Sequence, residues 1–172
     1  MLIETPKLED AKKLLEYFHE LVASDTNRVE RVEDVRKISI EMEESWIRNI
    51  LAKQAEGSYA ARCIYDDSGK VIGLGEIERR PRWIERHVAE IRFGLLPDHF
   101  SAGVAFVRVL ENLAKEMGIE VLYYFHLTTQ KQGLDIMQEC KYKEVGIIED
   151  YYKIDNSYVD RIYLQKNIVS PG

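Results

Sequence analysis

The stretch from residue 87 to residue 127 constrains the fold more than any other part of the sequence. Residues 87–96 (HVAEIRFGLL) and 120–127 (EVLYYFHL) read as strands, and apolar positions at helical spacing predict a helix between them. The second strand is almost continuously apolar, which is typical of a strand buried on both faces. Two strands joined through one helix are expected to be parallel, with a right-handed crossover.

The predicted elements around this unit favour antiparallel pairing. Strands are expected over residues 59–65 and 70–78, and the turn at 66–69 joins them into a hairpin. A short helix over 131–140 follows the parallel unit, and two more strands finish the chain. The sheet should therefore be mixed and mostly antiparallel.

Two further helices are predicted near the start of the chain, over residues 6–22 and 40–56. The charged segment 24–38 between them is ambiguous. The expected fold class is α/β (α+β), with a central mixed sheet, a splayed parallel strand pair and helices on both faces. We expect a single domain over residues 1–172, with 168–172 as a frayed tail.

The composition argues against several classes of protein. The chain has 172 residues, of which 45% are hydrophobic and 31% charged, as is typical of a soluble globular domain. No apolar run approaches the roughly 20 residues that cross a bilayer, and the first ten residues do not resemble a signal peptide. A net charge of −6 disfavours nucleic acid as a partner. Cys63 and Cys140 lack metal-ligand spacing, which predicts free thiols, no metal site and a cytoplasmic location.

Two small residues, Gly103 and Ala105, lie where the helix after strand 87–96 is expected to begin. The loop at 97–103 leaves the carboxyl end of that strand, where open α/β sheets bind ligands. Free N–H groups at a helix start favour a phosphate, and small residues let it approach. Gly94 within this strand indicates a β-bulge or a close backbone approach, and a bulge would splay the parallel strands and open a slot. The alternative is that Gly103 and Ala105 only relieve crowding.

Four stretches occur in an order that is typical of one family. They are LLPDHFSAGVA (95–105), AEIRF (89–93), QKQGLDIMQECKYKEVG (130–146) and YVDRIYLQKNI (158–168). Together they resemble the GNAT superfamily of acyl-CoA-dependent N-acetyltransferases over essentially the whole chain. The first is similar to the family's pyrophosphate motif, and the second to the strand that carries a glutamate base in several members.

The resemblance implies acetyl-CoA, or another acyl-CoA, as the donor and a primary amine of a small molecule or a peptide N-terminus as the acceptor. The pantetheine arm would lie along residues 93–96, and a backbone N–H near Leu95 would hold the oxyanion. The pyrophosphate would contact backbone N–H groups of residues 101–105. The cofactor-binding residues implied in this way are Phe93, Leu95, Leu96, Phe100, Ser101, Ala102, Gly103, Val104, Ala105, Gln130 and Met137.

Several of these positions depart from the family pattern. Phe100 replaces the usual Arg or Gln of the pyrophosphate motif, Ser101 replaces a common glycine, and Gln130 stands where Asn is typical. Met137 stands where many members have the tyrosine that protonates the leaving thiolate, and a thioether cannot donate a proton. The departures leave open an alternative function, a catalytically weak or inactive acyl-CoA-binding sensor or interaction module on the same fold.

The expected chemistry needs a carboxylate, because an alkyl amine with a pKa of about 10 is mostly protonated at neutral pH. Glu90 is the first candidate base and Glu76, on the preceding strand, is the second. Their structural alternatives are an ion pair of Glu90 with Arg92 and a solvent-facing position for Glu76. The candidate acids, each also readable as core or sheet surface, are Tyr123, Tyr124, Tyr142, Tyr151 and Tyr152.

An acidic run of Glu41, Glu43 and Glu44 opens the predicted helix 40–56. The helix dipole favours acidic residues at this end. The family resemblance adds a second interpretation, in which the run attracts a cationic acceptor, since the first two helices often build the acceptor site. Edge strands at the end of the chain favour a homodimer.

Overall fold

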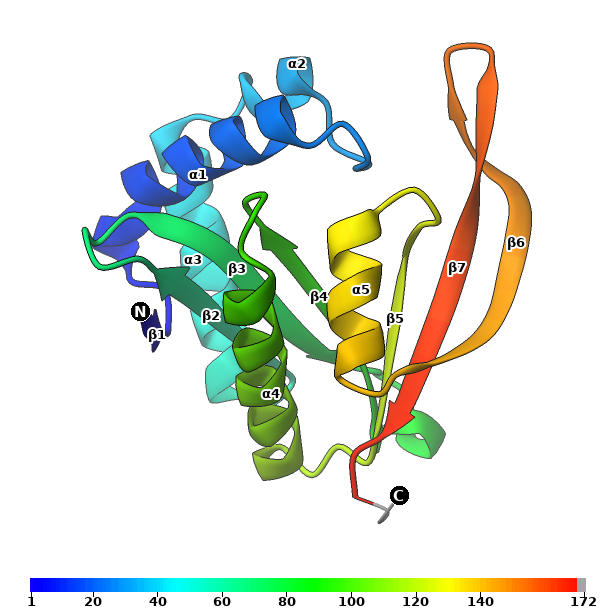
Figure 1. The fold of residues 1–172 in the computed structure, drawn as a ribbon. Coiled ribbons are helices and arrows are strands. Elements are labelled where there is room, and N and C mark those ends of the chain that lie inside the picture. Colours follow the sequence, from blue (N-terminus) through cyan, green and yellow to red (C-terminus); the bar gives the residue numbers. More distant parts are fainter. Residues whose placement is uncertain (170–172) are drawn as a thin grey trace.

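The computed structural model describes residues 1–169, which form a seven-stranded sheet covered by helices (Figure 1). The strands are β1 (Leu2–Glu4), β2 (Tyr59–Tyr65), β3 (Val71–Arg79), β4 (Val88–Leu95), β5 (Val121–Leu127), β6 (Lys143–Ile154) and β7 (Ser157–Asn167). The helices are α1 (Ala11–Ser24), α2 (Val32–Val35), α3 (Ile40–Ala55), α4 (Phe100–Glu116) and α5 (Lys131–Glu139), with 3-10 turns η1 (Leu8–Asp10) and η2 (Trp83–Glu85).

The sheet has the strand order β1-β2-β3-β4-β5-β7-β6, and β4 and β5 form its parallel pair. All other neighbouring strands are antiparallel, so the prediction of a mixed, mostly antiparallel sheet is confirmed. The parallel register ends after Glu90 pairs with Tyr123. Beyond that point β4 and β5 diverge, as the predicted splay requires.

The predicted β-bulge at Gly94 is wrong. Strands β3 and β4 pair without a register shift from Gly73↔Leu95 to Arg79↔Ala89. A Cβ atom at Gly94 would lie 2.5 Å from Tyr17 Oη of α1, so the glycine makes room for this helix. The splay therefore arises where β5 leaves β4, and not from an extra residue in β4.

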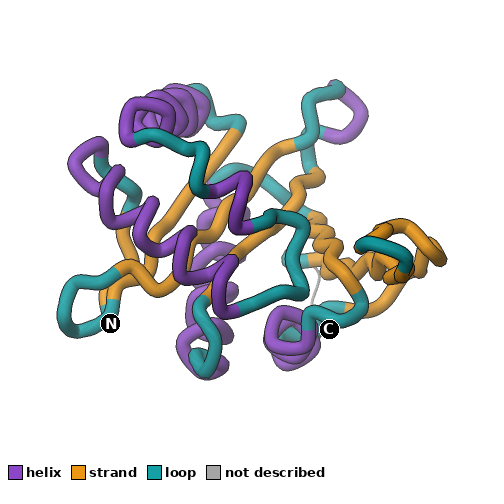
Figure 2. The backbone as a smooth tube through the Cα atoms, turned by 90° about the horizontal axis from the view of Figure 1, so that it is seen from above, coloured by secondary structure: helices purple, strands orange, loops and turns teal. Residues whose placement is uncertain are grey.

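Helices cover both faces of the sheet, as Figure 2 shows from above. Helix α4 lies directly on β3, because a Cβ atom at Gly75 would be only 2.6 Å from Leu110 Cδ1. Gly75 pairs with Phe93, so these two residues point to the same face of the sheet. Gly94 follows Phe93 and points to the opposite face, because successive strand residues alternate. Since Gly94 faces α1, helices α1 and α4 lie on opposite sides of the sheet.

Two helices begin at residues other than those predicted. The backbone N–H of Lys7 donates to Asp10 Oδ2 at 3.0 Å, and this local hydrogen bond gives the 3-10 turn η1 before α1 begins at Ala11. Helix α4 begins at Phe100, before Gly103. The ambiguous segment 24–38 contains only the short helix α2.

The predicted frayed tail is wrong at Ile168, which is buried and donates its N–H to the Glu120 carbonyl at 2.9 Å. Residues 170–172 of that prediction lie outside the described residues. Within residues 1–169, no helix combines the length and apolar character needed to cross a membrane.

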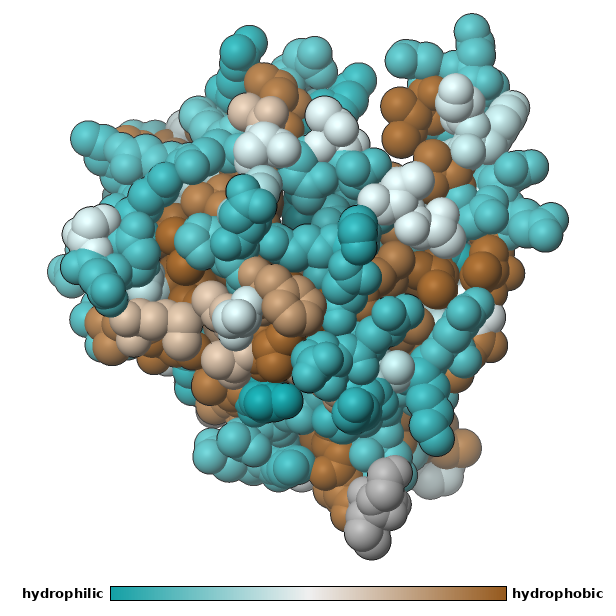
Figure 3. Space-filling view, viewed as in Figure 1, coloured by the Kyte–Doolittle hydropathy of each residue, from teal (hydrophilic) through white to brown (hydrophobic). Residues whose placement is uncertain are grey.

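Strands β6 and β7 form a long hairpin that projects from the rest of the sheet (Figure 1). The space-filling view shows a notch in the surface between the α2 region and this hairpin (Figure 3). Strand β6 is an edge of the sheet. Its exposed apolar side chains are Val145, Ile147, Ile148, Tyr151 and Ile154.

Candidate active site

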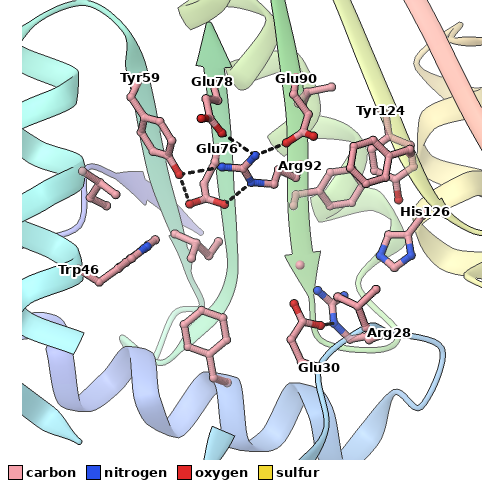
Figure 4. Close-up of a pocket in the computed structure, with 18 of the residues that line it drawn as sticks. Arg28, Glu30, Trp46, Tyr59, Glu76, Glu78, Glu90, Arg92, Tyr124 and His126 are labelled. Atoms are coloured by element: carbon pink, nitrogen blue, oxygen red, sulfur yellow. Dashed lines mark hydrogen bonds and ion pairs between the residues drawn. The ribbon is translucent and has the colours of Figure 1, made fainter. Parts of the chain in front are cut away.

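A cavity of about 510 Å³ lies between the sheet and helices α1 and α3. It extends from α3 across β3 and β4 to β5, as Figure 4 shows, and so it reaches the place where β4 and β5 diverge. The loop between α1 and α2 contributes residues 28–30, and Tyr152 of β6 also lines the cavity. The walls are rich in both aromatic and charged side chains.

Arg92 of β4 joins three carboxylates on the sheet side of this cavity (Figure 4). Its Nη1 contacts Glu90 and lies 2.8 Å from Glu78, and its Nε lies 3.0 Å from Glu76. The Tyr59 hydroxyl donates to Glu76 and accepts from Arg92 Nη2 at 3.2 Å. Burial alone would lower the pKa of Arg92, but the charges of Glu76 and Glu90 raise it above its usual range.

The strand register explains why these groups meet. Glu76 pairs with Arg92 across β3 and β4, and Glu78 pairs with Glu90. Both candidate bases, Glu90 and Glu76, therefore line one cavity. The ion pair of Glu90 with Arg92 is present. A solvent-facing Glu76 is wrong, because its side chain is only 15% exposed.

Glu43 of α3 lines the same cavity in a different electrostatic setting. The residue is only 4% exposed, and its Oε1 has no hydrogen-bond partner among residues 1–169. Burial, together with the negative charge of Glu76, raises the pKa of Glu43 to about 7. The three residues of the acidic run therefore have different surroundings. Glu43 is buried in the cavity, Glu41 is exposed, and Glu44 Oε2 lies 3.5 Å from Arg48 Nη2.

The β5 side of the cavity carries a second ion pair, between Arg28 Nε and Glu30 Oε2 at 3.2 Å (Figure 4). Next to it, burial and the nearby Arg28 charge lower the pKa of His126 to about 4. The imidazole is consequently neutral at pH 7. Within residues 1–169, no cluster of three or more His, Cys, Asp or Glu side chains could hold a metal ion.

Two of the five candidate acids line the cavity, Tyr124 and Tyr152. Tyr152 Oη accepts a hydrogen bond from Arg161 at 2.8 Å. Tyr124 is buried, and its hydroxyl has no partner among the described residues. Burial raises the pKa of Tyr124, so this hydroxyl keeps its proton at neutral pH. The remaining candidates, Tyr123, Tyr142 and Tyr151, do not line the cavity.

The gap between the diverging strands is narrow, with a free volume of about 10 Å³ between Phe93 and Leu95 of β4 and residues of β5 and α5. The Gln132 side chain spans its end. The amide nitrogen donates to the carbonyl oxygens of Leu95 (3.4 Å) and Leu96 (3.2 Å), and its oxygen accepts from the His99 N–H at 3.2 Å. The carboxyl end of β4 thus offers carbonyl acceptors to an amide.

Gln130 and Met137 differ in their relation to this gap. Gln130 borders it, and its amide nitrogen holds the loop after α1 by donating to Asp25 Oδ2 (2.7 Å) and the Asn27 carbonyl (2.9 Å). Met137 is fully buried in the core and borders neither the cavity nor the gap. Helix α5 therefore offers no proton donor at this position.

Gly103 has a packing role at the start of α4. A Cβ atom there would lie 2.4 Å from Ile136 Cδ1 of α5 and 2.8 Å from Leu95 Cδ2. Because such separations are far below van der Waals contact, the glycine lets α4 approach α5 and β4. The crowding interpretation of Gly103 thus has direct support.

The start of α4 also determines which backbone N–H groups are free. Gly103 N–H donates to the His99 carbonyl at 2.9 Å, and by helix geometry Val104 and Ala105 donate within the helix in the same way. Residues 100–102 precede these donors and have no helical acceptor. The free donors therefore lie nearer the N-terminus than the predicted span 101–105.

Sequence reasoning missed several residues of the site. Tyr59 could have been found from the hairpin register, since it stands opposite Glu78 on the neighbouring strand. Arg28 lies in the ambiguous segment, and nothing in its sequence context indicates that it reaches β5. Gln132 carries no signal either, because its contacts depend on how α5 docks beside β4.

Comparisons with known proteins agree with this geometry. The family model described as an acetyltransferase (GNAT) domain matches residues 3–163. No curated protein matches the sequence.

Many solved structures share the fold. An acetyltransferase of the GNAT family from Streptococcus pneumoniae is 15% identical, with a TM-score of 0.84 over 96% of this chain and 98% of that one. A ribosomal-protein-alanine N-acetyltransferase from Brucella melitensis is 18% identical, with a TM-score of 0.79 over 97% and 99%. A phosphinothricin acetyltransferase from Sinorhizobium meliloti, solved with acetyl-CoA, is 15% identical, with a TM-score of 0.78 over 96% and 87%. The chain belongs to the GNAT acetyltransferase family.

Proposed function

We propose that this chain is an N-acetyltransferase that moves an acetyl group from acetyl-CoA to a primary amine of a small molecule or a peptide N-terminus. The observation that carries the proposal is the divergence of β4 and β5 beyond Glu90, directly beside a cavity lined with carboxylates. Family membership supports it, as does the fold shared with a relative that was solved with acetyl-CoA. Acetyl-CoA would supply the thioester that the amine attacks.

The residues at the gap fit the donor's chemistry. Leu95 and Leu96 already accept hydrogen bonds from the Gln132 amide, and an amide of the pantetheine arm would suit the same carbonyls. Phe93 would line the arm. The free N–H groups of residues 100–102, at the positive end of α4, would receive the pyrophosphate. Binding would require Gln132 to leave its present position, because the gap is too narrow for a ligand otherwise.

Glu90 is proposed as the base, directly or through a water molecule, with Glu76 as the second candidate. Both line the cavity, and Arg92 holds their carboxylates in position. Acid–base assistance of this kind typically contributes about 10²–10⁴-fold to the rate. Tyr124 is proposed as the acid for the leaving thiolate. Its side chain lines the cavity and also borders the gap, and its hydroxyl has no hydrogen-bond partner among residues 1–169.

Calorimetric titration with acetyl-CoA tests the donor site. Desulfo-CoA and adenosine diphosphate separate the contribution of the pantetheine arm from that of the nucleotide. We expect saturable binding that needs the arm, followed by release of free thiol when primary amines are added. Absence of binding at millimolar acetyl-CoA would contradict the proposal, and binding without turnover of any amine would favour a sensor.

Glu90→Gln tests the base. The variant should bind acetyl-CoA within about 2-fold of the wild type and lose 10²–10⁴-fold in rate. Glu120→Gln, the same change at an exposed position, is the matched control and should keep the full rate. An unchanged rate in Glu90→Gln, together with a large loss in Glu76→Gln, would transfer the role to Glu76.

The proposal also includes a homodimer in the cytoplasm. Strand β6 is an unpaired edge with exposed apolar side chains, a surface that favours pairing with a second copy. Ile147 is 47% exposed on this strand, so Ile147→Lys should shift sedimentation toward the monomer. The free thiols of Cys63 and Cys140 fit a reducing compartment.

A further inference from the structure

Among residues 1–169, Glu43 differs from every other carboxylate of the cavity in having no cationic partner. Glu30 pairs with Arg28, while Glu76, Glu78 and Glu90 pair with Arg92. No salt bridge within 4.0 Å involves Glu43 among residues 1–169, and its buried Oε1 accepts no hydrogen bond there. A buried acceptor without a donor is costly, so the site is incomplete until a donor arrives.

The surroundings of Glu43 suit a cation. Aromatic rings of Phe18, Trp46 and Tyr59 line the cavity together with Glu43, and aromatic faces attract ammonium and guanidinium groups. The negative charge of Glu76 raises the pKa of Glu43 further, beyond the effect of burial. The third cation of the lining, Lys53, is exposed and lies 5.8 Å from the centre of the Tyr59 ring. A cationic group would therefore meet two carboxylates and several aromatic faces.

The reacting amine cannot be this cation. Only a neutral amine attacks a thioester, and the proposed position of attack is the gap between β4 and β5. Glu43 belongs to α3, whereas the gap lies at the β5 side, and the cavity spans both sides (Figure 4). An acceptor that reaches both must carry its positive charge at a distance from its reacting amine.

We infer that the acceptor carries a second, non-reacting ammonium or guanidinium group, and that Glu43 binds it. The inference rests on the proposed acetyltransferase activity and names its substrate class as diamines and similar dibasic molecules. One end of the acceptor would lie against Glu43 on α3. The other end, as the neutral amine, would reach the opening between β4 and β5.

The test pairs binding with turnover for α,ω-diaminoalkanes of three to eight carbons. Calorimetry measures diamine affinity in the wild type, in Glu43→Gln and in Glu41→Gln. A charged hydrogen bond of this kind corresponds to about 10–100-fold in affinity, so Glu43→Gln should weaken diamine binding by that factor. Glu41→Gln removes the same charge from an exposed position of the same helix and should bind diamines as the wild type does.

Turnover gives the second measurement. The wild type should acetylate the best diamine with a kcat/KM at least about 10-fold above that of the monoamine in which a methyl group replaces the second amine. This ratio should fall toward one in Glu43→Gln and stay unchanged in Glu41→Gln. Equal diamine affinity in Glu43→Gln and the wild type, or no diamine binding at any chain length, would overturn the inference. Diamines that bind through Glu43 and are never acetylated would instead contradict the proposed function.

Discussion

Replacing Glu43 with glutamine should stabilise the protein above neutral pH and leave its stability little changed near pH 4.5. The pKa of Glu43 rises from the usual 4.5 to about 7 because the side chain is buried and faces Glu76. Below pH 4.5 the carboxyl is protonated in both the folded and the unfolded chain. Between pH 4.5 and 7 the unfolded chain has lost the proton and the folded protein retains it, so the free energy of unfolding falls as the pH rises.

The full effect follows from the size of the pKa change. A rise from 4.5 to about 7 corresponds to about 3 kcal/mol, and this loss is constant once the pH is well above 7. Glutamine has a similar shape and does not titrate, so the variant avoids the loss. For a chain of this length, about 3 kcal/mol corresponds to roughly 6–12 °C in Tm.

Urea unfolding of wild type and Glu43→Gln at several pH values between 4.5 and 8.5 measures the difference directly. The other charged groups that line the cavity, including Glu76, Arg92 and Lys53, are present in both proteins, so their own titration largely cancels. Glu41→Gln serves as the control and should follow the wild type at every pH. Parallel curves for Glu43→Gln and the wild type would refute the reasoning, because they would mean that Glu43 ionises in the folded protein as freely as in water.

Three further predictions concern packing and the gap. Gly103→Val should lower the free energy of unfolding, measured in urea, by about 1–3 kcal/mol, because the new side chain would crowd Ile136. Ser101→Val, at an exposed position, is the control and should leave stability unchanged. A Gly103→Val variant of full stability that binds acetyl-CoA more weakly would instead assign Gly103 to ligand binding. The Arg161 guanidinium carbon lies 3.8 Å from the centre of the Tyr151 ring. Arg161→Lys should lower the free energy of unfolding by about 1 kcal/mol, because an ammonium group cannot stack on the ring as a planar guanidinium does. An unchanged urea midpoint would show that this contact does not stabilise the protein. Gln132→Ala should tighten acetyl-CoA binding, measured by calorimetry, by about 2–10-fold, because it frees the Leu95 and Leu96 carbonyls that the pantetheine arm needs. Weaker binding would show that Gln132 contacts the ligand and does not merely occupy its site.

The sequence alone was sufficient for the arrangement of elements around the parallel pair. A strand, a helix and a second strand over residues 87–127 already imply parallel pairing, because the crossover has one favourable hand. Alternating and helical periodicities are local properties of the chain, and they placed β2, β3, α3 and α5 within a few residues of their observed bounds. The order of short motifs was likewise sufficient to identify the family.

Helix starts and glycine roles were less predictable. Asp10 captures the Lys7 N–H and delays α1, which is a competition between two local hydrogen-bonding patterns. In the sequence, Gly94 cannot be distinguished from a glycine at a β-bulge, and Gly103 cannot be distinguished from a glycine of a phosphate-binding loop. Only the docking of α1 onto β4, and of α5 onto α4, determines that each glycine makes room for a neighbouring helix.

The charges of the cavity depended on tertiary structure most of all. Glu41, Glu43 and Glu44 are the same residue type in one short segment. The packing of α3 against the sheet buries Glu43, where the charge of Glu76 acts on it, and leaves Glu41 in solvent. Burial and distance between segments far apart in the chain set the pKa of a carboxyl group and its supply of partners. The sequence therefore determined which chemical groups the protein has and the order of its strands and helices, whereas the packing of α1 and α3 over the sheet decided which of those groups face one another.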